Sequence, residues 1–133
     1  MQPSNPTSQS EQSTVRVLIV DDMPQVREDL RILLQLSNEI EVVGEAGDGL
    51  EAIQQAELYH PDVVIMDMEM PVLDGLQATE QIKGRLLARR VVILSVHSEK
   101  GDVERAMQSG ADAFVQKGSS YLTLIEAIHS NKS

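Results

Sequence analysis

VLIVDDMPQV, at residues 17–26, runs from four apolar residues straight into two adjacent carboxylates, Asp21 and Asp22, before a helical pattern begins. Consecutive apolar residues, rather than alternating ones, are typical of a strand that is covered on both faces in a parallel sheet. The stretch therefore predicts a buried strand that delivers an acidic pair to one edge of a sheet.

Further short runs of β-branched and apolar residues alternate with helical patterns, which is typical of βαβ units. The expected strands occupy residues 15–20, 40–44, 62–66, 91–95 and 113–116. Five such units with right-handed crossovers predict an α/β fold of the flavodoxin-like type. This is a (βα)5 three-layer sandwich with a five-stranded parallel sheet in the order 2-1-3-4-5.

The segments between these strands carry apolar residues at helical spacing, and we expect these residues to face the sheet. In chain order they are Val26, Leu30, Leu33 and Leu34, then Ala52, Ile53 and Ala56, then Leu76, Thr79 and Ile82, then Val103, Ala106 and Met107, and finally Leu124, Ile125 and Ile128.

Length and composition limit the domain organisation and the partners. The 133 residues suit one domain at 14–130, with 1–13 expected to be a disordered tail and 131–133 a C-terminal remnant or the start of a linker. The net charge of −10 disfavours direct binding of nucleic acid or of an anionic membrane. The chain has no cysteine, no apolar run that could span a bilayer and no signal-peptide pattern, so a cytoplasmic location is expected.

Three carboxylates are expected to meet at one edge of the sheet. Ligands of such folds bind beyond the carboxyl ends of the strands, near the point where the strand order reverses. The first strand leads there to Asp21 and Asp22, and the third, DVVIMD, leads to Asp67. Because the three charges would repel one another, a hard divalent cation, Mg²⁺ above all, is the expected ligand.

Two complementary groups follow the remaining strands. The fourth strand ends in Ser95, whose hydroxyl can donate to an oxyanion, and the fifth leads to Lys117, a positive charge suited to phosphate. With Asp67 as nucleophile, these groups would form an aspartyl-phosphate site. Taken singly, Asp22 could cap a helix starting near Pro24 and the others could be surface or turn residues. Their joint arrival at one edge favours a site.

The motifs DD, MDMEMPVLDG, LSVH and GADAFVQKG together resemble the CheY-like receiver domain of two-component response regulators, from residue 15 to about residue 130. The pattern is most similar to the LuxR/FixJ/NarL-type branch. The resemblance implies that Asp67 accepts a phosphoryl group from a histidine kinase, a phosphotransfer protein or a small phosphodonor. It implies Mg²⁺, or alternatively Mn²⁺, held by Asp22, Asp67 and the backbone carbonyl of Glu69, with Asp21 acting through water.

The resemblance also implies a switch made by Ser95 and Phe114, which would couple the site to the face formed by the fourth helix, the fifth strand and the fifth helix. That face, or another helical face, would support a homodimer or an output partner. The chain would then be a signalling phosphoacceptor that assists its own phosphorylation and dephosphorylation, rather than an enzyme. A DNA-binding region outside this chain is the expected output.

Glu69 and His97 lie two residues after Asp67 and Ser95, and we hypothesise that they tune the lifetime of the phosphorylated state. Two other classes of function compete with the receiver. A flavin carrier would need a Ser, Thr or Gly-rich loop where DDMP stands, and a phosphate-ester hydrolase would need DxDxT, where this chain has DMEM. A degenerate receiver, acting as an interaction module without phosphorylation, is the remaining alternative.

Overall fold

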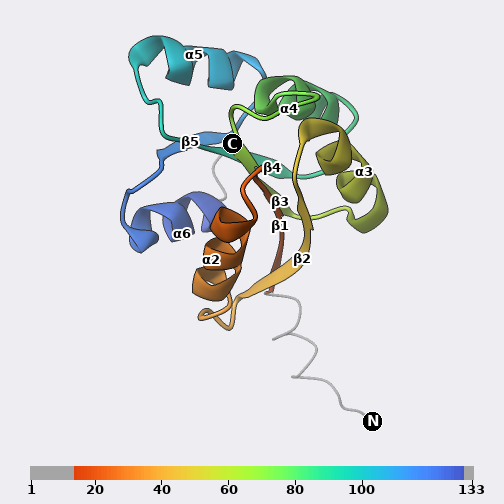
Figure 1. Cartoon of the computed structure of the whole chain (residues 1–133). Coiled ribbons are helices and arrows are strands. Elements are labelled where there is room, and N and C mark those ends of the chain that lie inside the picture. The colour runs from red at the N-terminus through yellow and green to blue at the C-terminus, as the bar shows by residue number, and fades with distance from the viewer. Residues whose placement is uncertain (1–13, 131–133) are drawn as a thin grey trace.

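The computed structural model describes residues 14–130, so the expected tail at 1–13 and the segment 131–133 lie outside the described residues. Five strands alternate with five helices (Figure 1). In chain order they are β1 Val15–Val20, α2 Pro24–Leu34, β2 Ile40–Ala46, α3 Gly49–Tyr59, β3 Val63–Asp67, α4 Gly75–Gly84, β4 Arg90–Ser95, α5 Lys100–Gln108, β5 Ala113–Gln116 and α6 Tyr121–His129.

The strands form one parallel sheet in the order β2-β1-β3-β4-β5, which confirms the predicted flavodoxin-like topology. Three strands have bounds that differ from the expectation. β4 begins one residue earlier than expected, at Arg90, which pairs with Val63 of β3. β2 extends to Ala46 because the β1–β2 register shifts beside Val17 and Leu18, which leaves one extra residue in β2. β3 begins one residue later than expected, at Val63, and includes Asp67, which pairs with Leu94 of β4. The carboxylate of Asp62 accepts a hydrogen bond from the backbone N–H of Arg16 in β1.

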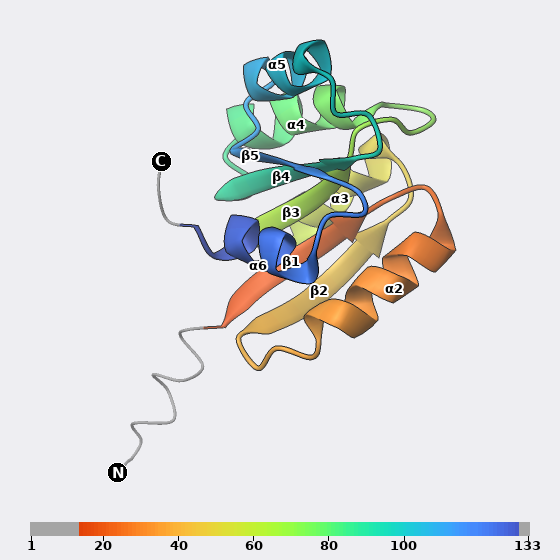
Figure 2. The same ribbon diagram turned by 90° about the vertical axis from the view of Figure 1, so that its left-hand side faces the viewer.

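Helices cover both faces of the sheet, and the core is accordingly split in two (Figure 2). α3, α4 and α5 pack on one face, with Ala56, Ile82 and Ala106 fully buried. α2 and α6 pack on the other face through Leu34 and Ile128. The three inner strands, β1, β3 and β4, are apolar on consecutive residues because both of their faces are covered.

Two of the expected core positions lie outward instead. Leu33 is 40% exposed and Met107 is 44% exposed. Leu33 and Leu34 are neighbours about 100° apart around the helix axis, so only one of them can face the sheet. Leu30 and Leu34, four residues apart, take the buried positions of α2.

The helix starts follow local chemistry. Asp74 caps α4 by accepting a hydrogen bond from Gln77 N, while the Gln77 side chain accepts from Asp74 N, a complete capping box. α2 begins at Pro24 after Met23 and has no side-chain cap, so Asp22 does not serve that role. The carboxylate of Asp22 is therefore not used by the helix and can take part in a site at the carboxyl ends of the strands. Within residues 14–130 no helix is long and apolar enough to cross a membrane.

Candidate functional site

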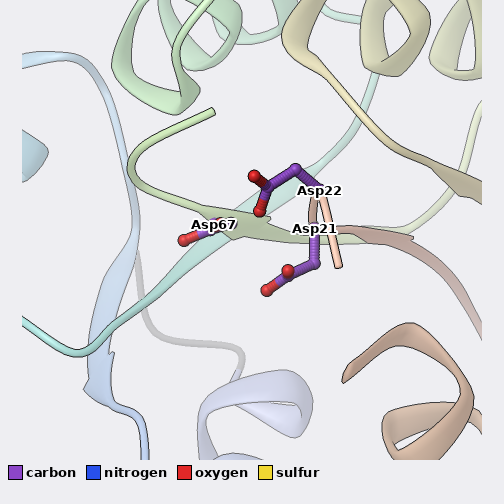
Figure 3. A group of neighbouring side chains, drawn as sticks. All are labelled: Asp21, Asp22 and Asp67. Atoms are coloured by element: carbon purple, nitrogen blue, oxygen red, sulfur yellow. The ribbon is translucent and has the colours of Figure 1, made fainter. Parts of the chain in front are cut away.

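The register of the sheet brings the acidic residues together. Val20 pairs with Met66, so the next residues along β1 and β3 are Asp21 and Asp67. Asp22 joins them, and carboxylate oxygens of all three lie within 4.8 Å of one another. In Figure 3 the three side chains extend into the same space at the carboxyl ends of these strands. The chain thus collects three negative charges at the predicted edge.

Lys117 stands against this cluster. Its Nζ donates a hydrogen bond to Asp21 Oδ2 at 2.9 Å and lies 3.5 Å from Asp67 Oδ1. Burial alone would lower the pKa of Lys117, but the hydrogen bond to Asp21 and the charges of Asp67 and Asp21 outweigh it and raise that pKa. Lys117 is therefore a fixed positive charge between two carboxylates.

Asp67 is the most perturbed carboxyl of the site. Its side chain is only 11% exposed, and burial together with the charges of Asp21 and Asp22 raises its pKa from 3.8 to about 6, although Lys117 and a backbone hydrogen bond at Glu69 act in the opposite direction. One ammonium does not balance three carboxylates. The negative charge of the cluster is therefore not fully compensated, and a further cation would be attracted to it.

The donor set fits a hard divalent cation. All three candidate ligand groups are carboxylates, which suit Mg²⁺, and none is a nitrogen or sulfur ligand of the kind that Zn²⁺ prefers. Asp22 is exposed and Asp67 is nearly buried, so a bound ion would keep contact with water on one side. Such an ion would offset the repulsion from Asp21 and Asp22, which together with burial raises the pKa of Asp67.

Ser95, the last residue of β4, is buried beside this edge. Its Oγ accepts a hydrogen bond of 3.0 Å from the backbone N–H of His97, and its carbonyl accepts one of 2.8 Å from the N–H of Lys117. Because the first bond uses a lone pair, the hydroxyl proton remains available for an incoming oxyanion. This second bond fixes the backbone of Lys117, the residue after β5, to the last residue of β4.

Two exposed residues meet at the rim of the site. His97 Nε2 lies 3.6 Å from Glu69 Oε1, and their side chains are 56% and 66% exposed. The pair links the loop after β3 to the loop after β4. Phe114 is partly buried and packs against the core layer of α3, α4 and α5, on β5 beside Ile93. The predicted switch residues, Ser95 and Phe114, therefore lie on neighbouring strands.

Two features of the site were missed in the sequence. The Arg27 side chain donates a 2.6 Å hydrogen bond from Nη1 to the backbone carbonyl of Asp21 and pairs with Glu45 at 3.0 Å, which fixes the end of β1. A Cβ on Gly75 would lie 1.9 Å from the Asp67 carbonyl oxygen, so only glycine fits there. In the sequence, a basic residue six positions after Asp21 could have indicated the first contact, and the Asp-Gly pair at 74–75 could have indicated the second.

The family of the chain follows from comparison with known proteins. The model of the response regulator receiver domain matches residues 17–129, and the chain belongs to this family.

Individual relatives agree with that assignment. The chain is 45% identical over 113 residues to the transcriptional regulatory protein PdtaR of Mycobacterium tuberculosis, and 33% identical over 120 residues to the nitrate/nitrite response regulator NarL of Escherichia coli. These alignments cover 85% and 90% of this chain but 54% and 56% of the relatives, so the chain spans about half the length of the curated relatives it matches.

Solved structures show the same fold. The signal receiver domain of the response regulator NarL from Mycobacterium tuberculosis superposes with a TM-score of 0.82 at 36% identity, covering 87% of this chain and 94% of that one. The response regulator domain of Thermotoga maritima CheB gives a TM-score of 0.79 at 33% identity, covering 90% and 99%.

Proposed function

We propose that the chain is a phosphoacceptor receiver in which Asp67 takes a phosphoryl group from a histidine kinase or a phosphotransfer protein. The observation that carries this proposal is the position of Lys117, whose Nζ bridges Asp21 and Asp67 within a cluster of three carboxylates. An isolated surface carboxylate gains little from a partly buried ammonium 3.5 Å away. A carboxylate that accepts a phosphoryl dianion is stabilised by such a positive charge, which offsets the added negative charge.

In the transfer, an oxygen of ionised Asp67 forms a bond to phosphorus while the bond from phosphorus to the donor histidine nitrogen breaks. With a pKa of about 6, Asp67 is about nine-tenths ionised at pH 7 even in the free protein. Lys117 would stay charged and pair with a phosphoryl oxygen, and the Ser95 hydroxyl would donate to another. Bound Mg²⁺ would supply charge neutralisation on the transferring group and would be held by Asp22, Asp67 and the Glu69 carbonyl, with Asp21 acting through water.

Ser95 and Phe114 would couple the site to the surface formed by α5, β5 and α6. Movement of the Ser95 hydroxyl toward a phosphoryl group would break its 3.0 Å hydrogen bond with His97 N. Phosphorylation then shifts the population between two arrangements of β4 and β5, and with it self-association or contact with an output partner. Regulation of transcription through a DNA-binding region outside this chain, in the cytoplasm, is the proposed output, consistent with the name of PdtaR as a transcriptional regulatory protein.

Glu69 and His97 would set the lifetime of the phosphorylated state. Their side chains meet at 3.6 Å on the exposed rim, where an attacking water would enter. Dephosphorylation rates of Glu69→Ala and His97→Ala should both differ from wild type, and equal rates in all three would remove this role. Rates are best read by phosphate release after removal of the phosphodonor.

The proposed function is tested by intact mass spectrometry. Incubation with acetyl phosphate and Mg²⁺ should add one phosphoryl group to the wild type and none to Asp67→Ala. Lys117→Ala, which should still bind Mg²⁺, should be phosphorylated much more slowly. The absence of an adduct in wild type, together with no response to beryllofluoride, would favour the alternative of an interaction module that works without phosphorylation.

A further inference from the structure

A second charged surface lies at the amino ends of the strands, opposite the carboxyl ends where Asp67 lies. Four of the eleven Lys and Arg residues of a chain with net charge −10 fall within the eight residues 83–90, KGRLLARR. This segment joins the end of α4 to the start of β4, at the amino ends of the strands. Positive charge is therefore concentrated away from the acidic site.

Only part of this charge is compensated. Lys83 pairs with Asp112 at 2.8 Å, and Arg85 pairs with Glu57. Arg90 donates through Nε to the carbonyl of Ala127 at 2.9 Å, which satisfies a donor but not the charge. Within residues 14–130, neither Arg89 nor Arg90 forms an ion pair.

Leu86 lies in the middle of this basic segment and is 83% exposed, more than any other large hydrophobic residue that the structure describes. It also has a left-handed backbone, with φ +57°. The N–H of Leu86 bonds to Lys83 O and the N–H of Leu87 to Ile82 O, which is the Schellman arrangement that ends a helix. Stability of the free chain would favour glycine at this position, since a Cβ is strained there and an exposed leucine gains nothing from burial.

The end of α3 repeats this feature nearby. His60 ends α3 with φ +47°, again in the left-handed region without being glycine. His60, Leu86 and Arg89 all line one open groove of about 470 Å³. Two of the three non-glycine residues with positive φ in the described chain therefore border the same groove. Both residues occupy the left-handed position that ends a helix, where glycine would be less strained.

We propose that this groove is a docking site for an acidic segment of a partner protein that presents an apolar side chain. Arg89 would pair with a carboxylate of the segment, and Leu86 would be covered by its apolar residue. A short protein segment is favoured over nucleic acid or an anionic membrane because it brings only a few negative charges near a chain of net charge −10 and is therefore repelled less. Unlike a nucleic-acid backbone, it can also present an apolar side chain that covers Leu86. The groove's own acid, Asp62, is held by a 2.9 Å hydrogen bond from the backbone N–H of Arg16, and the Arg16 guanidinium donates to the carbonyl of His60 at 3.0 Å, so a further positive charge lies beside the groove. Since the groove lies at the far edge from Asp67, its occupant would leave the phosphoacceptor open.

The probe is a synthetic peptide in which glutamates flank a single leucine, titrated into ¹⁵N-labelled protein. Chemical shift changes should fall on the amides of His60, Asp62 and residues 83–90 and should be lost with a peptide that carries glutamine for glutamate or serine for leucine. Leu86→Gly should weaken binding about fivefold while leaving Tm at least equal to that of wild type, because the backbone strain is relieved. Arg89→Glu should weaken it about tenfold.

Lys100→Glu is the matched control, since it makes the same change of charge at an exposed residue of α5. It should alter affinity by no more than about twofold. The proposal is overturned if the peptide shifts no residue of the groove at millimolar concentration, or if Lys100→Glu weakens binding as much as Arg89→Glu. It is also overturned if an oligonucleotide or a phosphatidylglycerol vesicle perturbs residues 83–90 more strongly than the peptide does.

Discussion

Replacing Asp67 by asparagine should stabilise the metal-free protein, although the variant can no longer be phosphorylated. Burial and the charges of Asp21 and Asp22 raise the pKa of Asp67 from 3.8 to about 6. A shift of about two units corresponds to about 3 kcal/mol by which the ionised carboxylate opposes folding. For a domain of this size that is a rise in Tm of about 10 °C.

The direction of the pKa shift determines how the contribution of Asp67 to stability changes with pH. A carboxyl whose pKa is higher in the folded than in the unfolded state binds more protons when folded, so its contribution favours folding below its unfolded pKa. That contribution is lost as the pH rises from about 4 to about 6, the range that the raised pKa of Asp67 defines. The difference between Asp67→Asn and wild type should therefore grow across this range and be constant above pH 7.

The assay is thermal unfolding in EDTA from pH 4 to pH 8, followed by circular dichroism. Mg²⁺ should raise the Tm of wild type at pH 7.5 much more than that of Asp67→Asn, because the ion binds the folded carboxylates. Glu104→Gln, which removes a charge from an exposed position on α5, is the matched control and should change stability by less than about 0.5 kcal/mol. An asparagine variant no more stable than wild type in EDTA would refute the reasoning.

Three further substitutions test contacts that hold the loops and strands of the domain in place. Val72 has φ +71° and is 76% exposed, so Val72→Gly should raise the midpoint of urea unfolding by relieving strain worth about 1 kcal/mol. Gly75→Ala places a Cβ 1.9 Å from the Asp67 carbonyl and should both lower Tm and slow phosphorylation, and an unchanged rate would mean that the loop after β3 moves freely. Asp112 accepts hydrogen bonds of 2.8 Å from Val91 N and a lysine, so Asp112→Ala should cost about 2 kcal/mol in chemical denaturation, and a loss below about 0.5 kcal/mol would contradict its role in holding β4.

Much of the fold was predictable because the strands are buried on both faces. Short runs of β-branched and apolar residues, several of them consecutive, located the five strands, and their alternation with helical patterns predicted a parallel sheet. The order 2-1-3-4-5 was expected as the commonest arrangement of five such units, and the structure confirms it. The convergence of Asp21, Asp22 and Asp67 followed from the same reasoning, since the carboxyl ends of neighbouring parallel strands share an edge.

Other features depend on contacts that periodicity does not encode. Leu33 and Leu34 are equally apolar, and the choice of Leu34 for the core follows from how α2 lies on the sheet. The bond from Arg27 to the Asp21 carbonyl depends on a side-chain conformation. A left-handed conformation is unusual for leucine, so the sequence alone would not predict that Leu86 ends a helix.

The most direct test of the central role of Asp67 is to identify the residue that carries the phosphoryl group. Protein treated with acetyl phosphate and Mg²⁺ is reduced with borohydride, which converts an aspartyl phosphate to homoserine, and the product is sequenced by tandem mass spectrometry. The account predicts homoserine at position 67 alone, present with Mg²⁺ and absent with EDTA. Homoserine at position 21 or 22 instead, or none at all under conditions that phosphorylate a control receiver, would contradict it.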